Sequence, residues 1–95
     1  MVVGVGKLVF RLHECRSLKA KRKVIKAIVR RIDNHFNVSV AEVGDNDVYQ
    51  RAQVGFAVVG NSGSLVNAKM DKIINMVYDL HLAEIIDSEM ELIHL

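Results

Sequence analysis

Residues 2–12 alternate between two sides of an extended chain and are rich in valine, which predicts a β-strand. The odd positions of this segment mix valine with Lys7 and Arg11, whereas the later even positions are all apolar. Gly4 and Gly6 share the even side and indicate that a helix backbone passes close to it. We therefore expect the even side to face the core, through Leu8, Phe10 and Leu12.

The same patterns divide the rest of the chain into five further elements. Ser17 is a suitable N-cap for a helix that should run to about Asn37. Residues 38–43 and 51–60 read as strands joined at the turn sequence "GDND". The sequence "NSGS" then ends the third strand. Asn61 is expected to cap a second helix that ends near His81. Residues 83–95 alternate once more and form the last predicted strand.

This order, βαββαβ, is typical of the ferredoxin-like α+β fold. Two right-handed crossovers and a central hairpin should give a four-stranded antiparallel sheet with both helices on one face. The core should then bring together four apolar side chains from different elements, which are Phe10, Ile28, Phe56 and Val77. The other face of the sheet should be bare or given to a partner.

Length and composition support one globular domain over residues 1–95. The hydrophobic fraction of 51% predicts a packed core, and 95 residues can form one without disulfide or metal support. The single Cys15 has no partner for an internal disulfide, which fits a reducing compartment. The first ten residues do not resemble a signal peptide, and no apolar run reaches the length of a membrane span. We therefore expect a cytoplasmic location.

Charge changes this picture because it is unevenly distributed. The formal net charge is only +2, yet residues 1–32 carry +9 and residues 33–95 carry −7. The segment "RSLKAKRKVIKAIVRR" (16–31) holds eight of the thirteen lysines and arginines and no acid. Such asymmetry is informative about partners and self-association rather than about the fold.

The helical repeat of the basic segment sorts its side chains onto two faces. Leu18, Ile25 and Ile32 belong to the apolar face, while a row of cations occupies the far side at spacings of four, three and four residues. At 1.5 Å per residue this row is about 16 Å long. We call it the cationic stripe; it consists of Lys19, Lys23, Lys26 and Arg30.

An unbroken stripe of like charge favours an anionic partner over an ordinary solvated face, which usually mixes signs. RNA is the partner that best suits a row of phosphate-binding cations. An acidic protein partner, or the acidic half of a second copy, is the alternative. The predicted nucleic-acid-binding set is Arg16, Lys19, Lys21, Arg22, Lys23, Lys26 and Arg30.

Lys21 leaves two interpretations open, because its helical angle places it beside the apolar face. Its amine either joins Arg16 and the first helical turn in a small anion pocket, or its stem covers apolar surface while the amine reaches solvent.

Other motifs give weaker signals. "GFA" (55–57) is similar to the RNA-stacking sequence of RRM domains, but Phe56 falls on the core side and Val54 and Val58 replace key residues. Metal binding is not expected: His13 should be on the surface, Cys15 should pack as a small apolar group, and His35 should help to end the helix. Asp45 and Asp47 suit a turn better than a cation loop.

No catalytic residue and no cofactor are predicted, and a non-enzymatic role is expected. Arg16 and Asn61 superficially resemble the arginine and asparagine of acylphosphatases, which share the fold, but the loop "LHECRSLK" lacks a glycine-rich phosphate cradle. A small acylphosphatase-like enzyme is therefore the weakest of the functional alternatives.

The open face of the sheet is predicted to be an oligomer interface. Lys7 and Arg11 should form ion pairs with acids of the last strand there. The remaining apolar cluster is unusually large for a surface exposed to water, so a homo-oligomer is expected. The interface residues are Val3, Val5, Val9, Val59 and Ile85.

Several stretches together resemble the YlxP-like family of small bacterial proteins. They are "MVVGV", "RSLKAKRKVIKAIVRR", "HFNVSVAEVGDNDVYQRAQVGFAVVGN" and the acidic last strand, and they cover nearly the whole chain. The resemblance implies a ferredoxin-like domain. It also implies association with the ribosome, because genes of this family often lie beside those of translation and ribosome-maturation factors. The resemblance identifies no catalytic residue in this chain.

Overall fold

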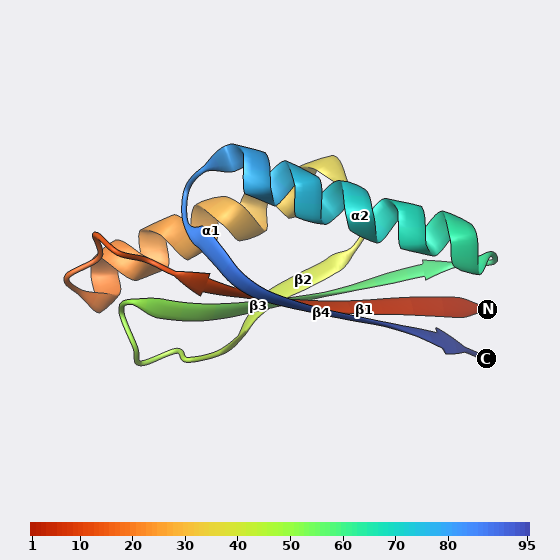
Figure 1. The fold of residues 1–95 in the computed structure, drawn as a ribbon, viewed down its shortest axis with the longest axis horizontal. Helices are drawn as coiled ribbons and strands as arrows, with labels where there is room; N and C mark the ends of the chain where they lie inside the picture. The colour runs from red at the N-terminus through yellow and green to blue at the C-terminus, as the bar shows by residue number, and fades with distance from the viewer.

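The computed structural model describes residues 1–95 and shows the predicted order of elements. Strand β1 is Val2–Arg11, helix α1 is Leu18–His35, and strands β2 and β3 are Ser39–Gly44 and Arg51–Gly60. Helix α2 (Gly63–Leu80) and strand β4 (Glu84–His94) complete the chain. Both helices lie on one face of the sheet (Figure 1), which confirms the ferredoxin-like α+β fold.

The sheet has the strand order β2-β3-β1-β4, with every neighbouring pair antiparallel. Strand β1 is central, and the register pairs Val2 with Gly60 and Arg11 with Arg51. The loop after β1 and the loop after β3 therefore leave from opposite ends of the sheet. Nine residues of strand separate these ends by about 30 Å.

The core lies between the sheet and the helices, on the side predicted from the even positions of β1. Leu8 and Phe10 are fully buried, and Phe56 and Val58 of β3 pack on the same side. The core cluster also contains Cys15, as predicted for a small apolar group. The helices contribute side chains from successive turns of their inner faces, namely Ile25, Ile28, Ile32, Val66, Met70, Ile73 and Val77.

Two glycines of β1 allow this close packing, but for different reasons. A side chain at Gly4 would collide with Val66 and Met70 of α2, as expected where a helix comes close. A side chain at Gly6 would instead collide with the ring of Phe56, which belongs to the neighbouring strand. The expectation of a nearby helix is thus confirmed at Gly4 and wrong at Gly6.

The ends of the helices partly follow the prediction. The Ser17 hydroxyl accepts a hydrogen bond from the Ala20 amide at 3.1 Å and caps α1. His35 ends the helix by a 2.8 Å contact between its Nδ1 and the Arg31 carbonyl oxygen. The N-cap of α2 is Ser62 rather than Asn61, and no side chain caps that end.

Strand β4 departs from strict alternation. A bulge between the partners of Val9 and Phe10 pairs Asp87 with Val9 but Ile85 with Phe10, so Ile86 is the extra residue. Ile85 therefore packs against the core cluster, on the helix side of the sheet. The prediction that Ile85 lies on the open face is wrong because the bulge reverses the alternation at this point.

The substitution Phe10→Ala or Phe56→Ala should lower the free energy of unfolding by about 3–5 kcal/mol, because each leaves a ring-sized cavity in the core. Urea denaturation measures this loss. Tyr78→Ala is the control: it removes an aromatic ring that is 65% exposed and should change stability by less than about 0.5 kcal/mol. Losses as small as the control's for both core variants would contradict the assigned core face.

Candidate nucleic-acid interface

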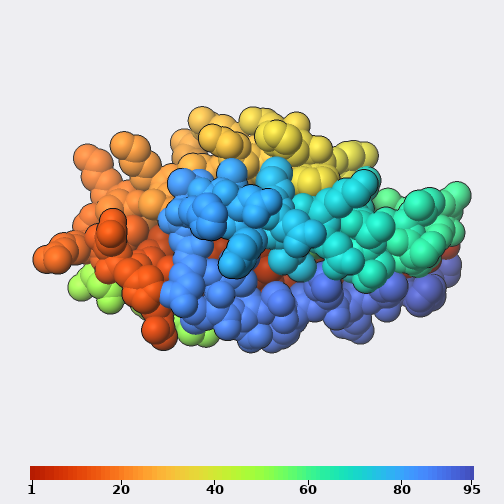
Figure 2. Space-filling model, turned by 45° about the horizontal axis from the view of Figure 1, so that its top comes forward, coloured from red at the N-terminus to blue at the C-terminus, as the bar shows by residue number.

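Helix α1 presents the cationic stripe to solvent. Its inner face is fixed by burial of Ile25, Ile28 and Ile32, and the helical repeat then turns the stripe away from the sheet. All four stripe residues are exposed, as are Arg16 and Arg22. Figure 2 shows α1, in orange to yellow, beside α2 on the helix-covered side of the molecule.

No acid forms an ion pair with the stripe, and the one acid of α1, Asp33, follows the last stripe residue, Arg30, by three positions. The four ion pairs of the chain use Lys7, His13, Lys21 and Arg51 as their cationic partners. The first turn of α1 contains no acidic residue either. Like charges three and four residues apart repel by a few tenths of a kcal/mol per pair, so the stripe lowers the stability of its own helix.

Lys21 does not belong to this surface, and both interpretations of it are wrong. Its side chain is fully buried, and its Nζ lies 3.3 Å from Oε2 of Glu42 on β2. The same ammonium donates a hydrogen bond to the backbone carbonyl of Asp45. Lys21 therefore binds protein oxygens, and it neither forms an anion pocket with Arg16 nor contacts a nucleic acid.

The loop after β2 is held by a second set of contacts around Asp45. Its carboxylate oxygen Oδ2 accepts hydrogen bonds from Arg51 Nε at 2.9 Å and Gln53 Nε2 at 2.8 Å. The Gln53 hydrogen bond, together with the Arg51 bond and charge and the nearby Lys21 charge, holds the pKa of Asp45 below its usual value despite partial desolvation. Asp45 adopts a left-handed backbone with φ of 57°, as aspartates in turns often do.

The buried Lys21–Glu42 pair is the feature that the sequence analysis missed. A signal for it existed, because Lys21 borders the apolar face of α1 and Glu42 occupies a core-facing position of β2, opposite Val54. Each residue alone looks like an exception to its pattern. Together, one cation and one anion on the two inner surfaces predict an ion pair.

The remaining candidate residues are dispersed. His13 contacts Glu84 at the surface, and the described side chains include no cluster of three or more histidine, cysteine and acidic residues suited to a metal. Arg16 and Asn61 occupy the loops after β1 and β3, at opposite ends of the sheet, so the structure does not bring them together. The acylphosphatase-like pairing of these two residues is therefore wrong.

The open face of the sheet carries the predicted valines and one of the predicted ion pairs. Lys7 Nζ lies 3.8 Å from Glu89 Oε1 across β1 and β4. Val59 and Ile93 are 63% and 42% exposed, whereas Val9 is already buried within the single chain. Arg11 forms no ion pair, because its neighbour Glu84 contacts His13 instead.

Comparison with known proteins gives a family match over most of the chain. The family described as "Protein of unknown function (DUF503)" matches residues 3–90. The uncharacterized protein YlxP of Bacillus subtilis (strain 168) is 32% identical over 76 residues, which are 80% of this chain and 83% of that protein. No helix is long and apolar enough to span a membrane.

One solved structure, a REP-associated tyrosine transposase bound to a REP hairpin, resembles the fold at 7% sequence identity. Its TM-score is 0.46, and the match covers 98% of this chain but 56% of the transposase chain. The present chain thus spans little more than half of that protein. A likeness this distant does not bear on function.

Replacing Lys21 with methionine should destabilise the protein by about 3 kcal/mol, because Glu42, only 20% exposed, would be left without its cation. Urea denaturation of Lys21→Met measures the loss. The matched control is Lys23→Met on the exposed side of α1, which should be nearly neutral. The double variant Lys21→Met/Glu42→Leu should recover part of the loss. Equal stabilities of Lys21→Met and its control Lys23→Met would contradict the buried pair.

Proposed function

The chain belongs to the DUF503 family, and we propose that this member is a non-enzymatic module that attaches to structured, ribosomal RNA through α1. The observation that supports the proposal is the exposed cationic stripe without an acidic partner. A soluble helix gains nothing from such a row, since it costs repulsion that intervening acids would remove. Phosphates of a nucleic acid would offset that repulsion when bound.

The geometry favours binding through phosphates and shape. Phe56 is buried in the core, so the sheet offers no aromatic platform for stacking bases of the kind that RRM domains use. The stripe is instead a straight row of flexible cations on a rigid helix, about 16 Å long. Phosphate contacts of this kind orient the protein on RNA and carry no base information.

Affinity for purified ribosomal RNA should therefore fall steeply with salt. Four phosphate contacts predict a log–log slope of about −3 to −4 in a titration followed by fluorescence anisotropy. Lys23→Glu/Lys26→Glu should abolish binding and leave the melting temperature unchanged or higher, because repulsion along α1 is relieved. The loss should be similar for RNAs of different sequence.

The matched control is Lys69→Glu/Lys72→Glu, which changes the net charge by the same amount but on α2. It should retain RNA binding if the stripe, rather than total charge, is the interface. An absence of RNA affinity for the unmodified protein at low salt would overturn the proposal. Capture of an acidic protein that depends on Lys23 and Lys26 would then support the alternative role as a protein adaptor.

We also propose that two copies associate through the open face of the sheet. Val59 and Ile93 are exposed there and Val3 and Val5 are half-buried, beside charged neighbours of both signs, with Lys7 and Arg11 on β1 and Glu89 and Glu91 on β4. A two-fold axis between the basic strand β1 and the acidic strand β4 would place the cations of one copy opposite the carboxylates of the other. The apolar members of this face are Val3, Val5, Val59 and Ile93.

Val5→Glu should convert the proposed dimer into a folded monomer, because it places a charge in the middle of the open face. Light scattering coupled to size-exclusion chromatography measures the mass, and circular dichroism reports the fold. Val48→Glu is the control, since it adds the same charge to an exposed loop position. A monomeric unmodified protein at high micromolar concentration would contradict the dimer.

A further inference from the structure

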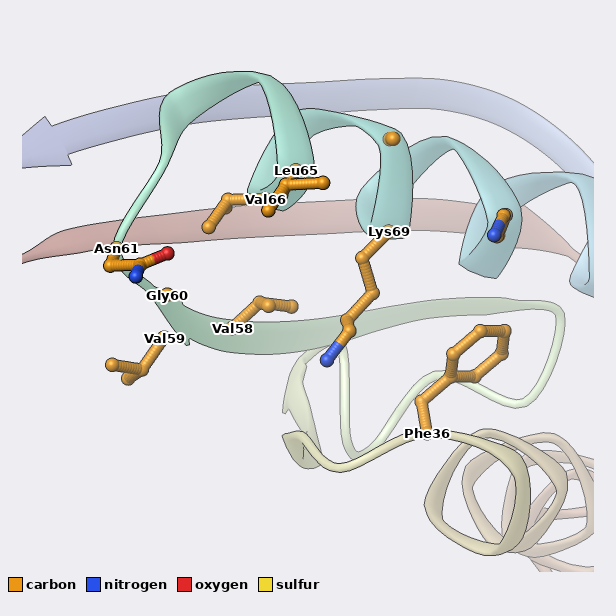
Figure 3. Close-up of a pocket in the computed structure, with 10 residues that line it drawn as sticks. Phe36, Val58, Val59, Gly60, Asn61, Leu65, Val66 and Lys69 are labelled. Atoms are coloured by element: carbon orange, nitrogen blue, oxygen red, sulfur yellow. The ribbon is translucent and has the colours of Figure 1, made fainter.

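A groove on the helix side of the molecule lies at the end of the sheet away from the start of α1. It has a volume of about 470 Å³, which is within the range of small-molecule sites. Its floor is the last part of β3, one wall is the first half of α2, and Phe36 at the end of α1 forms the opposite side (Figure 3). Strand β2 begins opposite Ala57, so Val58 to Gly60 have no β2 partner here.

The lining combines an apolar body with two cations. Six of the ten residues are hydrophobic, and none is acidic. Lys69 and Lys72, one helical turn apart on α2, supply the charge, and neither takes part in an ion pair. In Figure 3 the Lys69 side chain extends from α2 toward β3, and its amine lies between Val58 and Phe36.

We propose that this groove binds a small amphipathic anion, an apolar chain that ends in a carboxylate. The chain would lie along Phe36, Leu65 and Ala68, which line the groove and keep accessible surface, and the carboxylate would meet the ammonium groups of Lys69 and Lys72. Burial of the chain supplies the affinity, and the two unpaired cations select the charge of the ligand.

The donor set suits a singly charged carboxylate better than a doubly charged phosphate monoester. Phosphate sites in proteins commonly use the arginine fork or a nest of backbone amides at glycines with a left-handed backbone. The groove contains no arginine, and no glycine of the chain has a positive φ. Two lysine ammonium groups and the Asn61 amide suffice for a single negative charge.

This site is separate from the proposed RNA interface. The stripe lies on the outer face of α1, whereas the lysines of the groove belong to α2. The two charge-reversal pairs therefore serve as controls for each other. Each pair should remove one activity and keep the other, and a pair that leaves its own activity intact identifies the proposal that has failed.

The test is a ¹H–¹⁵N NMR titration of the full chain with octanoate, kept below its critical micelle concentration. Saturable shifts should concentrate on the amides of the groove residues. Octanol, of the same chain length without charge, should bind at least tenfold more weakly, and octylammonium should not bind. Lys69→Glu/Lys72→Glu should weaken octanoate binding at least tenfold, whereas Lys23→Glu/Lys26→Glu should leave it unchanged.

A second variant tests the apolar part of the site. Ala68 is exposed at the rim of the groove, and Ala68→Trp should fill it and displace octanoate with the fold intact, as shown by the dispersion of the spectrum. Equal affinities for octanol and octanoate, or octanoate binding that survives both groove variants, would overturn the proposal. Shifts that never saturate, or that lie outside the groove, would overturn it as well.

Discussion

The position of β1 between two partners determines the rest of the architecture. Both edges of this strand are hydrogen-bonded along its whole length, to β3 on one side and β4 on the other. Its period of two therefore determines which side chains of β3, and of β4 after its bulge, face the helices. Because Gly4 and Gly6 have no side chains, α2 can approach β1 at Gly4 and the Phe56 ring can pack over Gly6.

A consequence of this arrangement is that the helix layer and the open sheet face present different kinds of surface to a partner. The helix layer carries the exposed cations of α1, which form no ion pairs. The open face pairs its charges internally, as between Lys7 and Glu89, and leaves valines between them. One surface is therefore suited to long-range electrostatic attraction, and the other to short-range apolar contact.

Much of this could be predicted from the sequence because it depends on local periodicity. The alternation of β1, the Ser17 cap and the two faces of α1 each need only a short window of residues. The side of Ile85 could not be predicted, because one extra residue at Ile86 reverses the alternation and is defined only by the pairing with β1. The same holds for Lys21, whose partner Glu42 is brought to it by the fold.

The groove between α2 and Phe36 also could not be predicted, for a related reason. Its walls come from three elements, and its space exists because β2 starts late along β3. Neither Lys69 nor Lys72 belongs to a charge run that would attract notice. Residues that gather only through register and crossover leave no pattern in the sequence of any one element.

The bulge in β4 limits the forms of assembly open to this sheet. An outer strand that is locally twisted and carries four carboxylates is a poor template for a further strand, so growth of the sheet by addition at the β4 edge is disfavoured. Contact across the open face remains, and a two-fold contact of that kind is satisfied once a pair has formed. The irregular edge thus disfavours fibre growth through β4 and leaves a closed pair as the alternative on this side of the sheet.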